Sequence, residues 1–364
     1  MSGHKLSEHP FAVGLFCANR WGGNTQTTAP ERWDASWANN LLLAQQAEAA
    51  GVDFLLPLGI WRSLGGAAAT DGHSYEPITW AAGLLAATRA IKVFATVHVS
   101  FLHPILATKQ FVTCDHIGAG RFGLNIVSGS NKPEFDMFGV ELLEHDERYV
   151  FTEEWLDIVQ RLWSEPAPFE HHGRYFTLAG AQSDPKPFQG NRPIIVSAGS
   201  SGAGREFAAR RADALFMIVL TETGLAQKVQ AFREASSRGA DVLCSGHLFC
   251  RRTRREAQDY YDHIVHDHGD WAAAEALMND IFPNGRSIPA DRLQAMRERF
   301  CSGFGTYRLL GDPDDIVDGF RRLHAAGLSG MAFGLPNFLE DFPIIRDEVL
   351  PRMARAELRR PATA

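Results

Sequence analysis

Short apolar segments alternate with segments of helical periodicity along almost the whole chain, and this alternation constrains the fold more than any other feature. Strands that are apolar throughout are typical of parallel strands covered on both faces. Eight strand-helix units are the number that closes a (β/α)8 barrel, which needs about 250 residues before insertions. A doubly wound open sheet is the alternative architecture. The predicted strands are residues 11–16, 52–58, 91–99, 121–128, 194–198, 212–219, 242–251 and 328–335.

The 364 residues exceed what a plain barrel needs, and the excess is concentrated in three places. We predict one barrel domain, residues 1–364, with insertions after strand four (about 130–148) and after strand seven (about 271–310). A Pro- and Gly-rich stretch after helix four, residues 164–193, contains a predicted β-hairpin.

Charge and composition exclude several classes of function. The net charge of −7 argues against nucleic acid or an anionic membrane as the main partner. No run approaches the roughly 18 apolar residues of a membrane span, and residues 1–10 are too polar for a secretory signal. The five cysteines are odd in number and show no zinc or dithiol spacing. These features predict a reduced, cytoplasmic protein.

The fourth predicted strand places an amide among apolar residues. By strand alternation, Phe122, Leu124 and Ile126 share the face that packs on helices, and Asn125 points into the barrel. A buried amide must be hydrogen-bonded or it costs about 1–3 kcal/mol. Asn125 is therefore either a satisfied structural residue or a ligand contact, and the pattern leaves both open.

A glycine- and serine-rich turn, residues 199–204, follows the fifth strand and begins a helix. Backbone N–H groups and hydroxyls at a helix N-terminus form a site suited to phosphate. A simple tight turn is the alternative. The GxGxxG match at residues 118–123 runs from helix into strand, the reverse of a dinucleotide site, so we regard it as accidental.

The histidines do not indicate a metal site. His263, His266 and His268 lie in a polar stretch typical of a solvated helix face, and His98 lacks the His-x-His partner of a barrel hydrolase. We predict no metal.

Three blocks of residues resemble the bacterial luciferase-like flavin monooxygenases. They are GRFGLNIVSG at 120–129, KPEF at 132–135 and EHDERY at 144–149. The similarity is closest to the pyrimidine monooxygenase branch, with the dimethylsulfone and alkanesulfonate monooxygenases nearby. It weakens after about residue 216 and returns at 303–306 and 310–313.

The resemblance implies a (β/α)8 barrel that binds reduced FMN, supplied by a separate NAD(P)H-dependent flavin reductase, with O2 as co-substrate. It further implies oxygenation of a small heterocyclic amide or an organosulfur compound, and a homodimer or homotetramer. The residues that it places at the cofactor are Gly59 and Ile60 against the ring system, Asn125 and Glu134 reaching the flavin, and Arg148, Tyr149, Ser200 and Ser201 at the phosphate end. The turn at residues 199–204, here called the phosphate cradle, and the inward direction of Asn125 follow from the residues alone. Both agree with this placement of Ser201 and Asn125.

The chain departs from its relatives at positions close to the expected chemistry. Val99 stands where the pyrimidine branch has a threonine near the oxygen site. His247 aligns with a histidine of the alkanesulfonate branch, but Ser245 replaces the arginine two residues before it. With Asn125, His247 is a candidate catalytic residue, as an acid/base or a substrate contact; a core histidine is the alternative. Other residues that could line the substrate pocket are Trp21, Trp61 and Arg62.

Other functions remain open at this point. A deazaflavin-dependent reductase of the same superfamily, a metal-dependent hydrolase on the same barrel and a non-catalytic flavin-binding protein would share this fold.

Overall fold

Eight parallel strands form a closed ring in the computed structural model, which describes residues 5–63, 65–67, 73–199, 201–281 and 290–360. The strands are hydrogen-bonded in the order β11, β1, β2, β3, β4, β7, β8, β9. The ring closes because β9 pairs with both β8 and β11. The predicted (β/α)8 barrel is confirmed, and the open-sheet alternative is wrong because such a sheet would keep two free edges.

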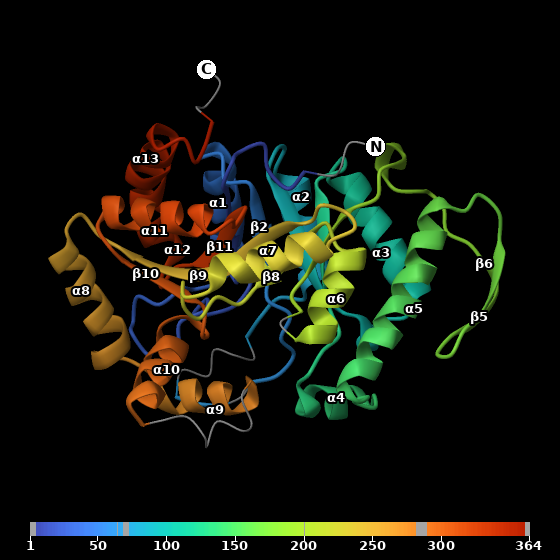
Figure 1. Ribbon diagram of the computed structural model, residues 1–364, viewed down its shortest axis with the longest axis horizontal. Coiled ribbons are helices and arrows are strands. Elements are labelled where there is room, and N and C mark those ends of the chain that lie inside the picture. Colours follow the sequence, from blue (N-terminus) through green and yellow to red (C-terminus); the bar gives the residue numbers. More distant parts are fainter. Residues whose placement is uncertain (1–4, 64, 68–72, 200, 282–289, 361–364) are drawn as a thin grey trace.

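The helices surround the strands on the outside (Figure 1). The barrel strands are β1 (Ala12–Phe16), β2 (Phe54–Leu56), β3 (Lys92–His98), β4 (Phe122–Val127), β7 (Ile194–Ser197), β8 (Ala214–Met217), β9 (Asp241–Cys250) and β11 (Gly330–Gly334). The helices are α1 (Trp37–Ala49), α2 (Pro77–Ala87), the short turn η1 (Val99–Phe101), α3 (Pro104–Ile117), α4 (Lys132–Phe138), α5 (His145–Ser164), α6 (Gly202–Arg211), α7 (Leu225–Ala235), α8 (Arg254–Asp262), α9 (Trp271–Ile281), α10 (Ala290–Gly303), α11 (Pro313–Ala325), α12 (Phe338–Ile344) and α13 (Leu350–Arg355).

Strand alternation separates two apolar cores. Phe122, Leu124 and Ile126 of β4 belong to the outer core between strands and helices, as predicted. Gly123 faces inward, where a Cβ would lie 2.3 Å from the ring of Phe94, so glycine makes room for that ring. The inner core consists of side chains from seven of the strands and neighbouring residues, among them Phe16, Phe54, Leu56, Phe94, Ile194, Val196, Phe216 and Leu243.

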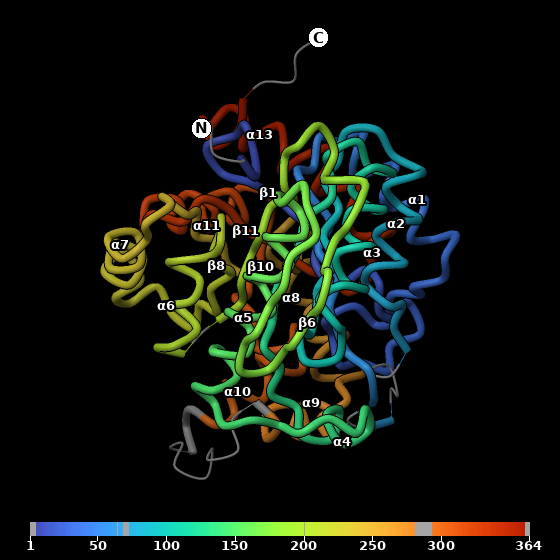
Figure 2. Tube along the Cα trace, turned by 90° about the vertical axis from the view of Figure 1, so that its right-hand side faces the viewer, coloured from blue at the N-terminus to red at the C-terminus, as the bar shows by residue number. Residues whose placement is uncertain are grey.

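The predicted hairpin after the fourth barrel helix is present as β5 (Phe169–His172) and β6 (Thr177–Ala181). Phe169 and Leu178 pack against Ile158 and Leu162 of α5, so the hairpin extends the outer core along that helix. The hairpin lies on the outer surface of the molecule, beside α5 (Figures 1 and 2).

One strand was not predicted. Tyr307–Gly311 forms β10, which pairs in parallel with the second half of β9. Residues 307–310 fall within the predicted insertion after strand seven. The segment is short and Arg308 is exposed within it, so it lacks the apolar pattern of a barrel strand.

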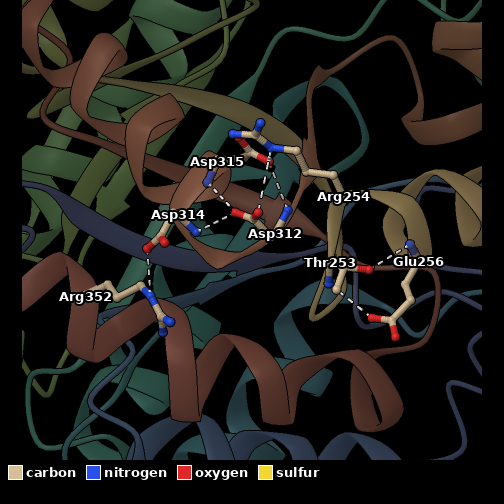
Figure 3. Close-up of polar contacts among 7 residues, drawn as sticks. All are labelled: Thr253, Arg254, Glu256, Asp312, Asp314, Asp315 and Arg352. Carbon is tan, nitrogen blue, oxygen red and sulfur yellow. Dashed lines mark hydrogen bonds and ion pairs between the residues drawn. The ribbon is translucent and has the colours of Figure 1, made fainter.

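Two capping boxes stabilise the helices that follow β9 and β10 (Figure 3). The side chain of Thr253 accepts from the N–H of Glu256 at the start of α8, and that of Asp312 accepts from the N–H of Asp315 at the start of α11. Arg254 pairs with Asp315 at 2.7 Å and joins the two helix starts. Each box satisfies N–H groups that the first helical turn leaves free.

The carboxyl ends of the strands define one end of the barrel, here called the mouth. Both views place α4, α9 and α10 at this end (Figures 1 and 2). In (β/α)8 barrels the reacting groups come from the loops at this end. The candidate site is therefore expected at the mouth.

Candidate functional site

Hydrogen bonds to its backbone hold the loop after β2 at the mouth. The buried amide of Asn19 holds Leu58 by two hydrogen bonds of 2.9 Å, one to its carbonyl and one from its N–H. At Gly59, a Cβ would lie 2.8 Å from Cε1 of His98 and 3.1 Å from the methyl group of Thr96. A side chain at this position would require the His98 ring to shift. The predicted flavin contacts of Gly59 and Ile60 remain a prediction.

The Asn125 amide points into the barrel and is buried, with 4% of its surface exposed. Its Nδ2 donates to the hydroxyl of Thr96 at 3.1 Å, and that hydroxyl donates to the carbonyl of Pro57 at 2.6 Å. Among the described residues, no donor reaches the buried Oδ1. A buried acceptor without a partner is costly, so this oxygen points to a bound group with an N–H or O–H.

Glu134 is buried in the first turn of α4, whose N-cap is Asn131. Its carboxylate accepts from the backbone N–H of Trp61 at 2.7 Å and so holds the loop after β2. Burial raises the pKa of Glu134, and the N–H groups of Trp61 and Arg62 oppose that shift. The predicted flavin contact of Glu134 remains a prediction.

The expected phosphate cradle lies at the N-terminus of α6. The hydroxyl of Ser201, the N-cap, accepts from the N–H of Gly204 at 3.1 Å. A Cβ on Gly204 would lie 2.5 Å from the Tyr149 hydroxyl and 2.7 Å from Cα of Gly199. The structure thus brings Tyr149 and the glycine-rich turn together. Ser200 lies outside the described residues.

Arg148 precedes Tyr149 in the first turn of α5. Its guanidinium donates to the carbonyl of Gly129, in the loop after β4, and its buried Nε meets no acceptor among the described residues. A planar guanidinium with a donor to spare suits a phosphate group.

His247 is fully buried on β9. Its Nε2 lies 3.0 Å from the hydroxyl of Thr25, and its Nδ1 has no partner within the described part of the chain. Burial lowers the pKa of His247 to about 3, so the ring is neutral at pH 7. Its surroundings are Thr25, Asn24, Gly303 and Gly334. Its catalytic role remains a prediction, and a purely structural role in the core remains the alternative.

The structure also shows the surroundings of the other residues named from the sequence. Trp21 packs against Tyr75 at 5.3 Å between ring centroids, and Trp61 and Arg62 lie in the loop after β2 at the mouth. Val99 is buried in the outer core, so its side chain belongs to the helix layer rather than the barrel interior. His263 pairs with Glu31 at 2.7 Å. No three His, Cys, Asp or Glu side chains gather as a metal site within the described residues.

Sequence reasoning missed Asn19 and Thr96 at the mouth, and it considered His98 only as a metal ligand. The last two lie on β3, and their inward direction follows from strand alternation with Phe94. Their neighbours are fixed by strand register, which the sequence does not reveal.

None of the described helices is both long enough and apolar enough to span a bilayer. The five cysteines are all buried free thiols.

Comparisons with known proteins agree with this geometry. A family model described as luciferase-like monooxygenase matches residues 11–330. An FMNH(2)-dependent dimethylsulfone monooxygenase of Pseudomonas fluorescens (strain Pf0-1) is 30% identical over 361 residues, covering 97% of each chain. The pyrimidine monooxygenase RutA of Methylobacterium radiotolerans is 34% identical over 244 residues, 65% of this chain and 63% of its own. The crystal structure of DmoA from Hyphomicrobium sulfonivorans has the same fold, with a TM-score of 0.86 at 18% identity, covering 98% of this chain and 90% of its own.

Proposed function

This chain belongs to the luciferase-like monooxygenase family, and on that basis we propose that it is an FMN-dependent monooxygenase. Its substrate is a small organosulfur compound or a small heterocyclic amide of the pyrimidine kind. The observation that carries the proposal is the pairing of an unsatisfied acceptor, Oδ1 of Asn125, with a phosphate cradle at α6 on the same barrel end. A flavin mononucleotide has the ring N–H and the phosphate that these two features need.

The residues present fit FMN. Ser201, Tyr149 and Arg148 would hold the phosphate, and Gly59, Ile60 and Asn125 would hold the ring, with Ser200 and Glu134 as further contacts. Reduced FMN supplies the electrons that let O2 give one oxygen atom to the substrate and the other to water.

The chain's own residues bind, orient and exclude water. Glu134 fixes the loop that carries Gly59 and Ile60, and the Asn125 amide, held by Thr96, presents Oδ1 as an acceptor. His247 is neutral at pH 7, and its candidate role is a proton or substrate contact. Orientation and a dry pocket are what a protein adds to cofactor chemistry.

The supply of reduced flavin is part of the proposal. The relative's name, FMNH(2)-dependent, favours a separate NAD(P)H-dependent flavin reductase as the supplier. Five buried free thiols favour a reducing compartment, the cytoplasm. We also propose a homodimer or homotetramer, which light scattering would test.

The test supplies purified protein with chemically reduced FMN and ¹⁸O₂. Dimethylsulfone, other sulfones, uracil and other cyclic amides are then screened by mass spectrometry for one incorporated ¹⁸O atom. Incorporation that requires both the protein and reduced FMN supports the proposal. Hydride transfer from a reduced deazaflavin without oxygen incorporation would show instead that the protein is a reductase. Metal-dependent hydrolysis would show that it is a hydrolase.

A further inference from the structure

His98 is the last residue of β3, at the mouth, and the flavin contacts proposed above leave it without a role. It lies on the inward face of the strand. Its ring lies between two loops: a Cβ on Gly59 would be 2.8 Å from Cε1 of His98, and one on Gly129 would be 3.6 Å from Cδ2. Most of His98 is covered but some of its surface remains exposed, whereas His247 is fully buried. The ring thus borders the space beside Gly59, where the flavin ring is proposed to lie.

A hydrogen bond from Trp61 fixes which nitrogen of His98 carries the proton. The indole Nε1–H of Trp61 lies 3.3 Å from Nδ1 of His98. An indole nitrogen can only donate, so Nδ1 must be the unprotonated, accepting nitrogen. Burial lowers the pKa of His98 to about 4, so the ring is neutral and its single proton lies on Nε2. No described residue accepts a hydrogen bond from Nε2.

Trp61 is itself held in place from two sides. Its backbone N–H donates to the buried carboxylate of Glu134 at 2.7 Å. Its ring meets Phe138 edge-to-face, with 5.2 Å between ring centroids. Because Trp61 is held by Glu134 and Phe138, its hydrogen bond fixes the orientation of the His98 ring. The direction of the Nε2–H bond of His98 is therefore fixed as well.

Aromatic rings form the wall around this donor. Phe101 stacks on His98 with centroids 5.5 Å apart, and Phe138 stacks on Phe101 at 4.2 Å and 5°. On α4, Phe138 and Met137 remain 40% and 54% exposed, so the wall continues to the surface as an apolar edge. The buried charged group beside this wall is the carboxylate of Glu134, on which Asp280 and the exposed Arg62 act electrostatically.

We propose that His98 is the specificity-determining residue of the mouth, donating its Nε2–H to a carbonyl or sulfonyl oxygen of an uncharged substrate held among Trp61, Phe101 and Phe138. The proposal rests on the proposed monooxygenase function and narrows its substrate class. One neutral donor in an aromatic wall satisfies one acceptor oxygen. A sulfonate or carboxylate substrate would lose its hydration near the carboxylates of Glu134 and Asp280, and the Arg62 guanidinium already interacts electrostatically with Glu134.

The first test measures the tautomer without using activity. The full chain is labelled with ¹⁵N-histidine, and the signals of His98 are assigned by their loss in His98→Gln. We expect Nδ1 unprotonated and Nε2 protonated at pH 7. Trp61→Phe keeps the ring but removes the indole donor, so it should shift the signals toward a tautomer mixture. A protonated Nδ1 in the wild-type chain would overturn the proposal.

The second test measures selectivity. Two pairs of probes differ in charge: dimethylsulfone against methanesulfonate, and uracil against orotate. We expect the wild-type chain with reduced FMN to convert an uncharged member and not its charged partner. His98→Ala should raise the KM for that probe about 10- to 100-fold with the affinity for reduced FMN unchanged. His98→Gln, which retains an N–H donor, should recover part of the loss.

The matched control is His116→Ala. His116 lies at the other end of the barrel, in the last turn of α3, where its Nε2 contacts the carbonyl of Lys186. This variant should behave as the wild type.

The outcomes separate the two proposals. If the wild-type chain oxygenates a probe and His98→Ala leaves KM unchanged, or if a charged probe is preferred, the His98 proposal alone is wrong. If probes are converted only with a reduced deazaflavin, the monooxygenase proposal is wrong, and the KM of His98→Ala in that reaction still decides the role of His98. If no probe is bound or converted, the substrate class and the His98 proposal are both rejected.

Discussion

The backbone N–H of Trp61 donates to the buried carboxylate of Glu134 at 2.7 Å, which ties α4 to the loop after β2. Removing this acceptor leaves a partly buried N–H without a partner. Glu134→Ala should lower the free energy of unfolding by about 1–3 kcal/mol, measured by urea denaturation. It should also speed proteolysis of the loop. Glu134→Gln keeps a side-chain carbonyl and should lose less. Equal losses in the two variants would contradict this role.

The second prediction concerns Asn125. Asn125→Ala removes the buried acceptor Oδ1, so the dissociation constant for reduced FMN should rise about tenfold, equivalent to about 1.4 kcal/mol. Anaerobic fluorescence titration measures it. The control is Asn40→Ala, which removes a buried amide that accepts from the indole of Trp80 on the outer side of the barrel. It should lower stability without changing FMN affinity, whereas unchanged binding in Asn125→Ala would reject the placement.

A third prediction separates the phosphate from the ring. If Arg148 holds the phosphate, Arg148→Ala should weaken reduced FMN about tenfold or more and leave reduced riboflavin, which has no phosphate, almost unchanged. Isothermal titration with both flavins gives the two affinities. Arg174→Ala is the matched control. Arg174 is exposed and pairs with Glu147, which lies next to Arg148 on α5. A parallel loss for both flavins would place Arg148 elsewhere.

The fourth prediction follows from His247. The folded state lowers the pKa of this histidine to about 3 from an ordinary value near 6.5. As pH falls below about 6.5 the unfolded chain takes up the proton first, so stability falls with pH until about 3. Each pH unit in that window costs up to about 1.4 kcal/mol. Between pH 7 and pH 5, the wild-type chain should therefore lose about 2 kcal/mol more than His247→Gln in urea unfolding. Equal losses would show that His247 can be protonated without unfolding.

Local patterns predicted much of the fold and the helix start at Ser201. The alternation of β4 identified which side chains face the helices and which face inward, because that period is set by the backbone. The turn at 199–204 predicted a helix start, and Ser201 is the N-cap of α6. These features depend on neighbours along the chain, so they can be read from the sequence.

Contacts between distant segments could not be predicted in this way. The bond between Trp61 and His98 depends on the register of β2 and β3, and the burial of His247 depends on Thr25 in the loop after β1. Both arise only when the ring of strands closes. The strand β10 was missed for the same reason, since its pairing with β9 defines it more than its own residues do.

The strand β9 closes the ring by pairing with β8 at Asp241–Cys244 and with β11 at Leu243–His247, and it pairs with β10 at Gly246–Cys250. The segment that carries α8, α9 and α10 follows the end of β9 and leads into β10, which pairs with β9 again. Both of its ends are therefore held by the same strand. Because β8 and β11 pair with β9 along other residues or its other edge, we expect exchange of this segment between family members to leave the barrel strands paired. Urea denaturation of such chimaeras would test this.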